Sequence, residues 1–174
     1  MHRSNLVLGV ISALGAPTAA YATTYLSIPQ AQAAMFPGEL LHPAFRQLSA
    51  QQIGEIKQAS GEVPLSKDLR AWHASSGGWF IVDQVVGKHE FITYALALDA
   101  QGAVKSVEIL DYRESYGGQV RDARWRAQFI GRRAGRPLRL DREIHNISGA
   151  TLSSRHVTDG VRRLLATYAV ALAR

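Results

Sequence analysis

The sequence predicts an α+β fold, an antiparallel β-sheet with helices packed on it and a long C-terminal helix. Four short segments rich in β-branched and aromatic residues follow one another in the middle of the chain, separated by glycine-containing turns. Near the C-terminus the apolar residues instead recur at helical spacing. A chain of 174 residues is long enough to bury one sizeable core.

The first segment, residues 1–22, is typical of an export signal. His2 and Arg3 precede an apolar stretch from Leu6 to Ala16, and Ala20-Tyr21-Ala22 offers a cleavage site. The stretch is shorter than the roughly 20 residues that span a bilayer. We therefore expect a periplasmic or extracytoplasmic protein, membrane-associated if the segment is retained. The alternative is a buried or interfacial N-terminal helix.

Residues 23–66 are expected to form an N-terminal helical segment, with the main domain over residues 67–174. A short helix is predicted from Ile28 to Phe36, where Pro37-Gly38 ends it. A second is predicted from Ser49, a suitable N-cap, to about Ser60.

The main domain begins with the predicted strands, which cover residues 69–75, 79–87, 91–99 and 104–112. A helix over residues 120–130 and an irregular, arginine-rich segment over residues 131–147 follow. The last helix is predicted from about Ser154 to Ala173. Its buried stripe would consist of Val157, Val161, Leu164, Leu165, Tyr168 and Leu172.

Composition excludes several kinds of site. Without cysteine there can be no disulfide, zinc–thiolate site, c-type haem attachment or cysteine nucleophile. The sequence has no GxGxxG, P-loop, GxSxG or HExxH motif, and its histidines lack metal-ligand spacing. We therefore predict no metal site and no catalytic residue. The net charge of +6 arises in residues 121–142, which hold eight arginines and two aspartates, while the rest of the chain is neutral.

The most informative segment is Ser148-Gly149-Ala150-Thr151, just before the last predicted helix. Gly149 permits a tight turn and close approach of a ligand. The helix that follows presents unpaired N–H groups and the positive end of its dipole, which favour a phosphate. Arg155 could add a charge-assisted contact. The alternative is an ordinary helix cap rich in serine and threonine.

This segment resembles the flavinylation motif of the FMN-binding domain family, which includes subunits of the sodium-translocating NADH:quinone oxidoreductase and of the Rnf electron-transport complex. The resemblance covers about residues 79–165. Besides the motif, it rests on residues 94–99, Gly102, and residues 107–114, 116–118, 125–129 and 157–161. One position departs from the pattern, because His145 stands where the family usually has aspartate.

The resemblance implies that a flavin transferase esterifies the phosphate of FMN to Thr151. The cofactor-binding residues would be Thr151 itself with Ser148, Gly149, Ala150, Ser153, Arg155, Glu114, Tyr116, Gly117 and Gly118. Trp79, Tyr112 and Trp125 are further aromatic candidates for packing on the flavin, each with a core position as its alternative.

The implied function is electron relay between a membrane redox donor and an extracytoplasmic acceptor. The expected partners are the flavin transferase and a membrane-bound or periplasmic redox partner. Two alternatives remain: a flavin-dependent reductase of a small acceptor, and a non-redox module that binds an anion or lipid. An exported protein meets no DNA, so nucleic acid is not an expected partner. The arginines of residues 121–142 would form a solvated face, favour reduced anionic flavin, or dock an acidic redox partner.

Overall fold

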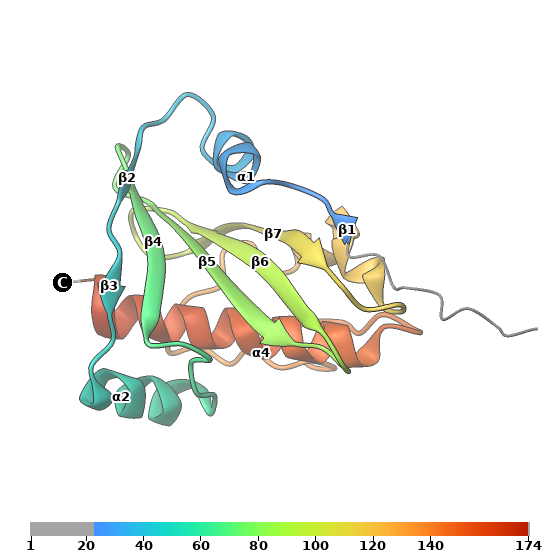
Figure 1. Ribbon diagram of the computed structural model, residues 1–174. Helices are drawn as coiled ribbons and strands as arrows, with labels where there is room; N and C mark the ends of the chain where they lie inside the picture. The colour runs from blue at the N-terminus through green and yellow to red at the C-terminus, as the bar shows by residue number, and fades with distance from the viewer. Residues whose placement is uncertain (1–22, 174) are drawn as a thin grey trace, which may run out of the picture.

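The computed structural model describes residues 23–173, so the predicted export signal lies outside the described residues. Its centre is an antiparallel sheet with strand order β1-β7-β6-β5-β4-β2, and β3 also pairs with β4 (Figure 1). The four long strands are β4 (Asp68–Ala74), β5 (Trp79–Val86), β6 (Phe91–Leu98) and β7 (Val104–Tyr112). They confirm the four predicted strands and the α+β fold.

The N-terminal segment extends both edges of this sheet. Besides helices α1 (Ile28–Met35) and α2 (Ala50–Ser60), it contains β1 (Thr23–Thr24), β2 (Leu41–Pro43) and β3 (Arg46–Gln47). The prediction of a helical segment missed these strands, because two or three residues carry no detectable alternation. Both helices begin as expected, with Ser27 and Ser49 each in a capping box.

The sheet buries apolar side chains on both faces. Strand residues alternate between the two faces, so that Ala71, Ile81 and Leu96 join the core beneath α4, whereas Trp72 and Phe80 join a smaller core with α1. Figure 1 shows α1 and α4 on opposite sides of the sheet.

The predicted helix over residues 120–130 is broken in two. A 3₁₀ turn, η1 (Gly118–Arg121), precedes α3 (Ala123–Ala127), and the Asp122 carboxylate between them accepts hydrogen bonds from the N–H groups of Arg124 and Trp125. An aspartate in this capping role starts a new helix. Residues 131–147 hold no helix or strand beyond an isolated bridge, as predicted.

The last helix, α4 (Thr151–Thr167), continues into a π-helical turn, η2 (Tyr168–Leu172). It begins three residues before the predicted start, so the expectation that Thr151 lies in the preceding loop is wrong. Thr151 is instead the first residue of the helix. The Ala150 carbonyl accepts the first helical hydrogen bond from the Ser154 N–H, so the helix already includes the polar residues from Thr151 to Ser154.

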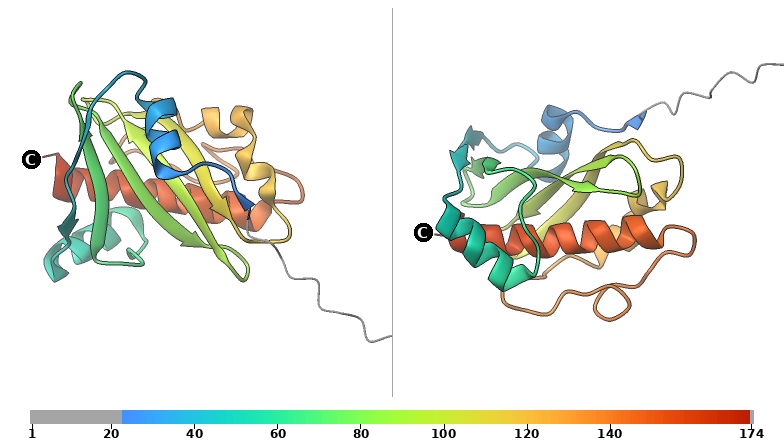
Figure 2. Two further views of the ribbon diagram at one scale, coloured as in Figure 1. Left: turned by 45° about the horizontal axis from the view of Figure 1, so that its top comes forward. Right: turned by 60° about the horizontal axis from the view of Figure 1, so that its bottom comes forward.

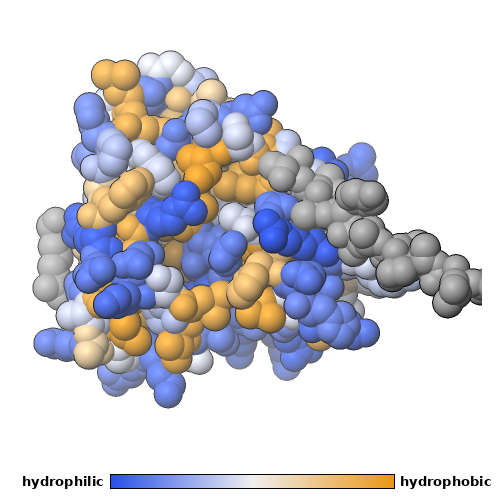
Figure 3. Space-filling model, viewed as in Figure 1, coloured by the Kyte–Doolittle hydropathy of each residue, from blue (hydrophilic) through white to orange (hydrophobic). Residues whose placement is uncertain are grey.

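The arginine-rich segment runs alongside α4, from the end of α3 back to the start of α4 (Figure 2). On the face in Figure 3, apolar side chains form several separate patches with polar side chains between them. Among the helices of residues 23–173, none has the length and apolar character needed to cross a bilayer.

Candidate functional site

A pocket of about 440 Å³ lies at the N-terminus of α4. Three segments surround it: the turn between β5 and β6; the glycine turn, defined here as residues 114–118; and the attachment loop, residues 146–150, with the first turn of α4. The lining residues are Lys88, His89, Glu114, Ser115, Tyr116, Gly117, Gly149, Ala150, Thr151, Leu152 and Ser153.

The pocket brings together seven of the residues expected to bind the cofactor: Glu114, Tyr116, Gly117, Gly149, Ala150, Thr151 and Ser153. The other three lie beside it in the chain and outside the lining. Ser148 is exposed in the attachment loop, Gly118 begins η1, and Arg155 is exposed on α4. The two halves of the predicted site, 30 residues apart in sequence, therefore meet across one cavity.

The N-terminus of α4 has no side-chain cap. Ala150 occupies the N-cap position, and its carbonyl accepts the first helical hydrogen bond from the Ser154 N–H at 2.9 Å. The other helices are capped by Ser27, Ser49 and Asp122. The first N–H groups of α4 therefore remain available at the pocket, where the helix dipole also favours an anion.

Thr151 is exposed at this helix end, and the attachment loop fixes its hydroxyl. The Asn146 side-chain amide donates a hydrogen bond to Thr151 Oγ1 at 3.2 Å, while Asn146 Oδ1 accepts one from the Ile147 N–H at 2.8 Å. Gly149 allows the loop to turn with a φ of +81°, in the left-handed region that favours glycine. The loop thus presents a polarised hydroxyl at the pocket.

The glycine turn is packed directly against α4. The buried Tyr112 hydroxyl donates a hydrogen bond to the Tyr116 carbonyl, and its oxygen lies 2.8 Å from Ser153 Oγ. Because the phenol has only one hydrogen, Ser153 is the donor in the second contact. Burial raises the pKa of Tyr112, although the Ser153 hydrogen bond opposes this effect. Tyr112 therefore stays protonated and joins the turn to the helix.

Gly117 has no room for a side chain. A Cβ atom there would lie 2.5 Å from Ser153 Oγ and 2.6 Å from the Tyr112 hydroxyl, and the residue's φ is +93°. Both the space and the backbone conformation therefore require glycine.

Glu114 holds the turn between β5 and β6 in place. Its carboxylate accepts hydrogen bonds from the N–H groups of His89 at 2.5 Å and Glu90 at 3.0 Å. Partial burial raises the pKa of Glu114, but hydrogen bonds from the main chain of Glu90, His89 and Lys88 outweigh it, so that the net pKa is lowered. These contacts position the turn between β5 and β6 against the glycine turn.

The aromatic candidates have different surroundings. Tyr116 lines the pocket with 86% of its surface exposed. Trp79 lies at the other end of β5, edge-on to His73 with ring centroids 4.8 Å apart. Trp125 is buried against Phe129 and donates a hydrogen bond from Nε1 to the His145 carbonyl at 2.8 Å. Tyr116 is thus the aromatic residue positioned to face a ligand in this pocket.

None of the eight arginines of residues 121–142 lines this pocket. Several have structural partners: Arg126 pairs with Glu108 at 2.5 Å, and Arg139 pairs with Glu143 at 3.2 Å. The pocket is instead lined by Lys88 and His89, which the sequence prediction missed. Their position in a hairpin turn gave no sign that the turn would fold against the glycine turn.

His145, the departure from the family pattern, has an exposed side chain and a fixed main chain. Its N–H donates a hydrogen bond to Gln128 Oε1 at 2.7 Å, and its carbonyl accepts the Trp125 bond. No group of three or more potential metal ligands occurs within residues 23–173.

Comparison with known families agrees with this geometry. Residues 87–166 match the model of the FMN-binding domain family. The matched span contains the whole glycine turn, the attachment loop and most of α4. No curated protein sequence matches the chain. Residues 87–166 therefore belong to the FMN-binding domain family, and the molecule is a flavin-binding protein.

Proposed function

We propose that this protein is an exported electron carrier whose FMN is esterified through its phosphate to Thr151. One observation supports it most strongly: an exposed threonine hydroxyl at an uncapped helix N-terminus, opening into a ligand-sized pocket within an FMN-binding domain. When bound, FMN supplies the redox chemistry, and the protein supplies its position and electrostatic surroundings.

The residues of the pocket suit the two ends of this cofactor. The uncapped N–H groups of α4 would hold the phosphate, whose negative charge the helix dipole stabilises. Tyr116 and Leu152 offer exposed apolar surface beside the same pocket, suited to an aromatic ring. Lys88 also lines the pocket, and its positive charge would favour a reduced, anionic flavin.

Thr151 would form the covalent bond. Its Oγ1 accepts the hydrogen bond from Asn146, so the hydroxyl's own hydrogen is free to leave as the oxygen bonds to phosphorus. The transferase would supply a flavin whose phosphate carries a leaving group, and that group departs as the new ester forms. The step is a substitution at phosphorus, so no oxidation state changes.

Electron relay fits the exposure of the site. Tyr116 is 86% exposed and Leu152 is 47% exposed, so a protein partner could approach the cofactor without any movement of a lid. The segment before Thr23 supports export, which would place a membrane-bound donor and an extracytoplasmic acceptor within reach. The partners of this proposal are therefore a flavin transferase and these two redox proteins.

The test is flavin fluorescence from denatured protein after co-expression of the full chain with a flavin transferase in an exporting host. We expect the periplasmic fraction to carry the fluorescence, Thr151→Ala to lose it, and Thr151→Ser to keep it. Ser75→Ala, which removes an exposed hydroxyl in the turn between β4 and β5, is the matched control. Covalent flavin persisting in Thr151→Ala, or its absence from the wild-type chain, would refute the attachment.

A separate experiment tests the relay. Membranes that contain a reduced quinol or an NADH-linked donor should bleach the flavin absorbance of the purified holoprotein, and an added acceptor protein should restore it. Rapid steady-state reduction of a small acceptor by the holoprotein alone would favour a reductase instead.

A further inference from the structure

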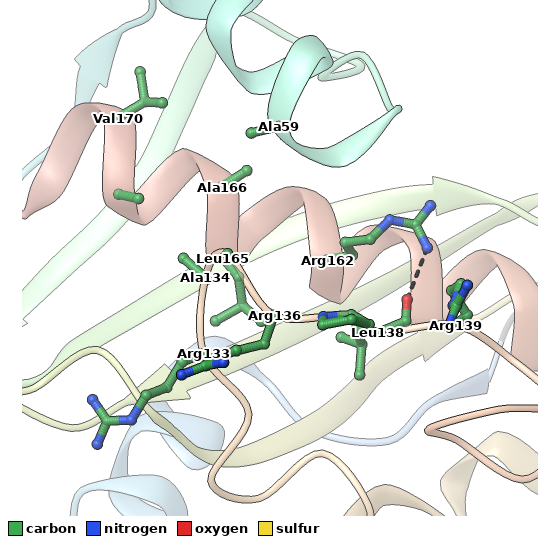
Figure 4. Close-up of a pocket in the computed structure, with 13 residues that line it drawn as sticks. Ala59, Arg133, Ala134, Arg136, Leu138, Arg139, Arg162, Leu165, Ala166 and Val170 are labelled. Atoms are coloured by element: carbon green, nitrogen blue, oxygen red, sulfur yellow. Dashed lines mark hydrogen bonds between the residues drawn. The ribbon is translucent and has the colours of Figure 1, made fainter.

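We propose that a second site, along the C-terminal half of α4, binds a single-chain amphiphilic acid of the long-chain carboxylate class. The cavity is about 750 Å³ and lies between α2, α4 with η2, and the arginine-rich segment (Figure 4). We call it the arginine trough, defined by its apolar residues Ala59, Leu165, Ala166 and Val170 and by Arg133 and Arg136.

The apolar side of the trough suits a hydrocarbon chain. Leu165 and Ala166 of α4 are buried in the core, while Val170 is partly exposed. Ala59 faces them from α2 (Figure 4), and the small alanine side chains leave the space between the two helices open. Ligand pockets of about 300–1,000 Å³ are mostly apolar with a few polar groups, and the trough fits this description.

The other side carries unbalanced positive charge. No aspartate or glutamate lines the trough among the described residues. Two lining arginines are neutralised: Arg162 pairs with Asp159 at 3.0 Å and Glu62 at 3.3 Å, and Arg139 pairs with Glu143.

Arg133 and Arg136 are different. Neither forms an ion pair within residues 23–173, although Arg133 donates a hydrogen bond to the Gln101 carbonyl at 2.6 Å. Arg133 and Arg136, lining residues without a carboxylate partner, complement a ligand with one acidic head and an apolar tail. This charge complementarity identifies the occupant.

The trough is separate from the flavin pocket. Arg162 follows Thr151 by eleven residues on the same helix, a distance of about 16 Å at 1.5 Å per residue. The two cavities share no lining residue. Because of this separation, the proposal does not rest on the proposed electron transfer, and each can fail without the other.

The probe is decanoate below its micelle concentration, titrated calorimetrically into the full chain. We expect saturable binding near one equivalent, with no binding of acetate and much weaker binding of decyltrimethylammonium. The double variant Arg133→Gln, Arg136→Gln should bind decanoate at least tenfold more weakly, as expected when charge-assisted hydrogen bonds are lost. Arg142→Gln, from the same segment but outside the trough, should bind normally.

A second variant tests the apolar side. Ala169 lines the trough and is exposed, so Ala169→Trp should fill the cavity and abolish binding without unfolding the protein, as thermal melting would verify. Several results would overturn the proposal: no decanoate binding, equal binding of the cationic amphiphile, or unchanged affinity in the double variant. Binding to anionic phospholipid vesicles without binding of free decanoate would also overturn it, in favour of a membrane surface.

Discussion

The pocket at the N-terminus of α4 has two walls, and they are built in opposite ways. The glycine turn is held by the protein's own contacts. The Tyr112 hydroxyl bonds to the Tyr116 carbonyl and to Ser153, and these two side chains leave no space for a Cβ at Gly117. The attachment loop is open. Apart from Gly149 and its two chain neighbours, no heavy atom lies within 4 Å of the point that a Cβ would occupy there, and the helix that follows has no side-chain cap.

The two walls therefore have different roles: one sets the shape of the pocket, and the other provides the groups that can bind a ligand. The glycine turn uses its polar groups internally and so sets the form of the cavity. The attachment loop and helix end leave theirs available for a ligand such as the proposed FMN. Substitutions in the first wall should therefore change stability, and those in the second should change flavin content more than stability.

The largest loss of stability is expected for Gly117→Ala. The new Cβ would lie under 3 Å from two oxygen atoms, and alanine would also adopt a left-handed backbone. Together these effects should cost about 3 kcal/mol. Urea unfolding measures the loss, and an effect below about 1 kcal/mol would show that the turn is not tightly packed.

Tyr112→Phe should rank next. It removes the hydroxyl that joins the Tyr116 carbonyl to Ser153 in a buried position. The expected cost is about 1–3 kcal/mol, because both partners lose a hydrogen bond. A double-mutant cycle with Ser153→Ala gives the coupling between them, and strict additivity would contradict a shared bond.

Gly149→Ala should cost less than Gly117→Ala, about 1–2 kcal/mol. Only the left-handed backbone conformation, with a φ of +81°, opposes the new side chain, since the space around it is open. The same unfolding experiment compares the pair directly. Equal losses of unfolding free energy in Gly117→Ala and Gly149→Ala would show that the two walls are packed equally tightly.

The smallest effect concerns pH. The pKa of Glu114 is lower in the folded protein than its ordinary value, so its carboxylate stabilises the fold above that ordinary value, about 4.3. This contribution is lost as pH falls through the lowered pKa. Glu114→Gln should therefore be less stable than wild type at neutral pH, and the difference should shrink on acidification. If the difference in unfolding free energy stayed constant from pH 7 to pH 3, the charge of the Glu114 carboxylate would not contribute to stability.

The sequence predicted the four long strands because their alternation and turns are local signals. Through the resemblance to a family motif it also predicted that residues 148–151 and 116–118 act together, and the structure brings both segments to one pocket. Flavin binding by these residues stays a prediction. The sequence could not show that Tyr112 reaches Ser153, because that contact joins residues 41 apart. Of the three roles considered for the arginines of residues 121–142, flavin tuning rested on their proximity in sequence. None of them lines the pocket at the N-terminus of α4, and Arg133, Arg136 and Arg139 line a different cavity along the same helix.

The attachment of FMN to Thr151 is tested most directly on one peptide. Trypsin cleavage after Arg142 and Arg155 releases residues 143–155, which contain Ser148, Thr151 and the two serines that follow it. Mass spectrometry of this peptide from protein made with a flavin transferase should find an FMN phosphoester, and fragmentation should place it on Thr151. An unmodified peptide, or the adduct on one of the serines, would contradict the proposed attachment.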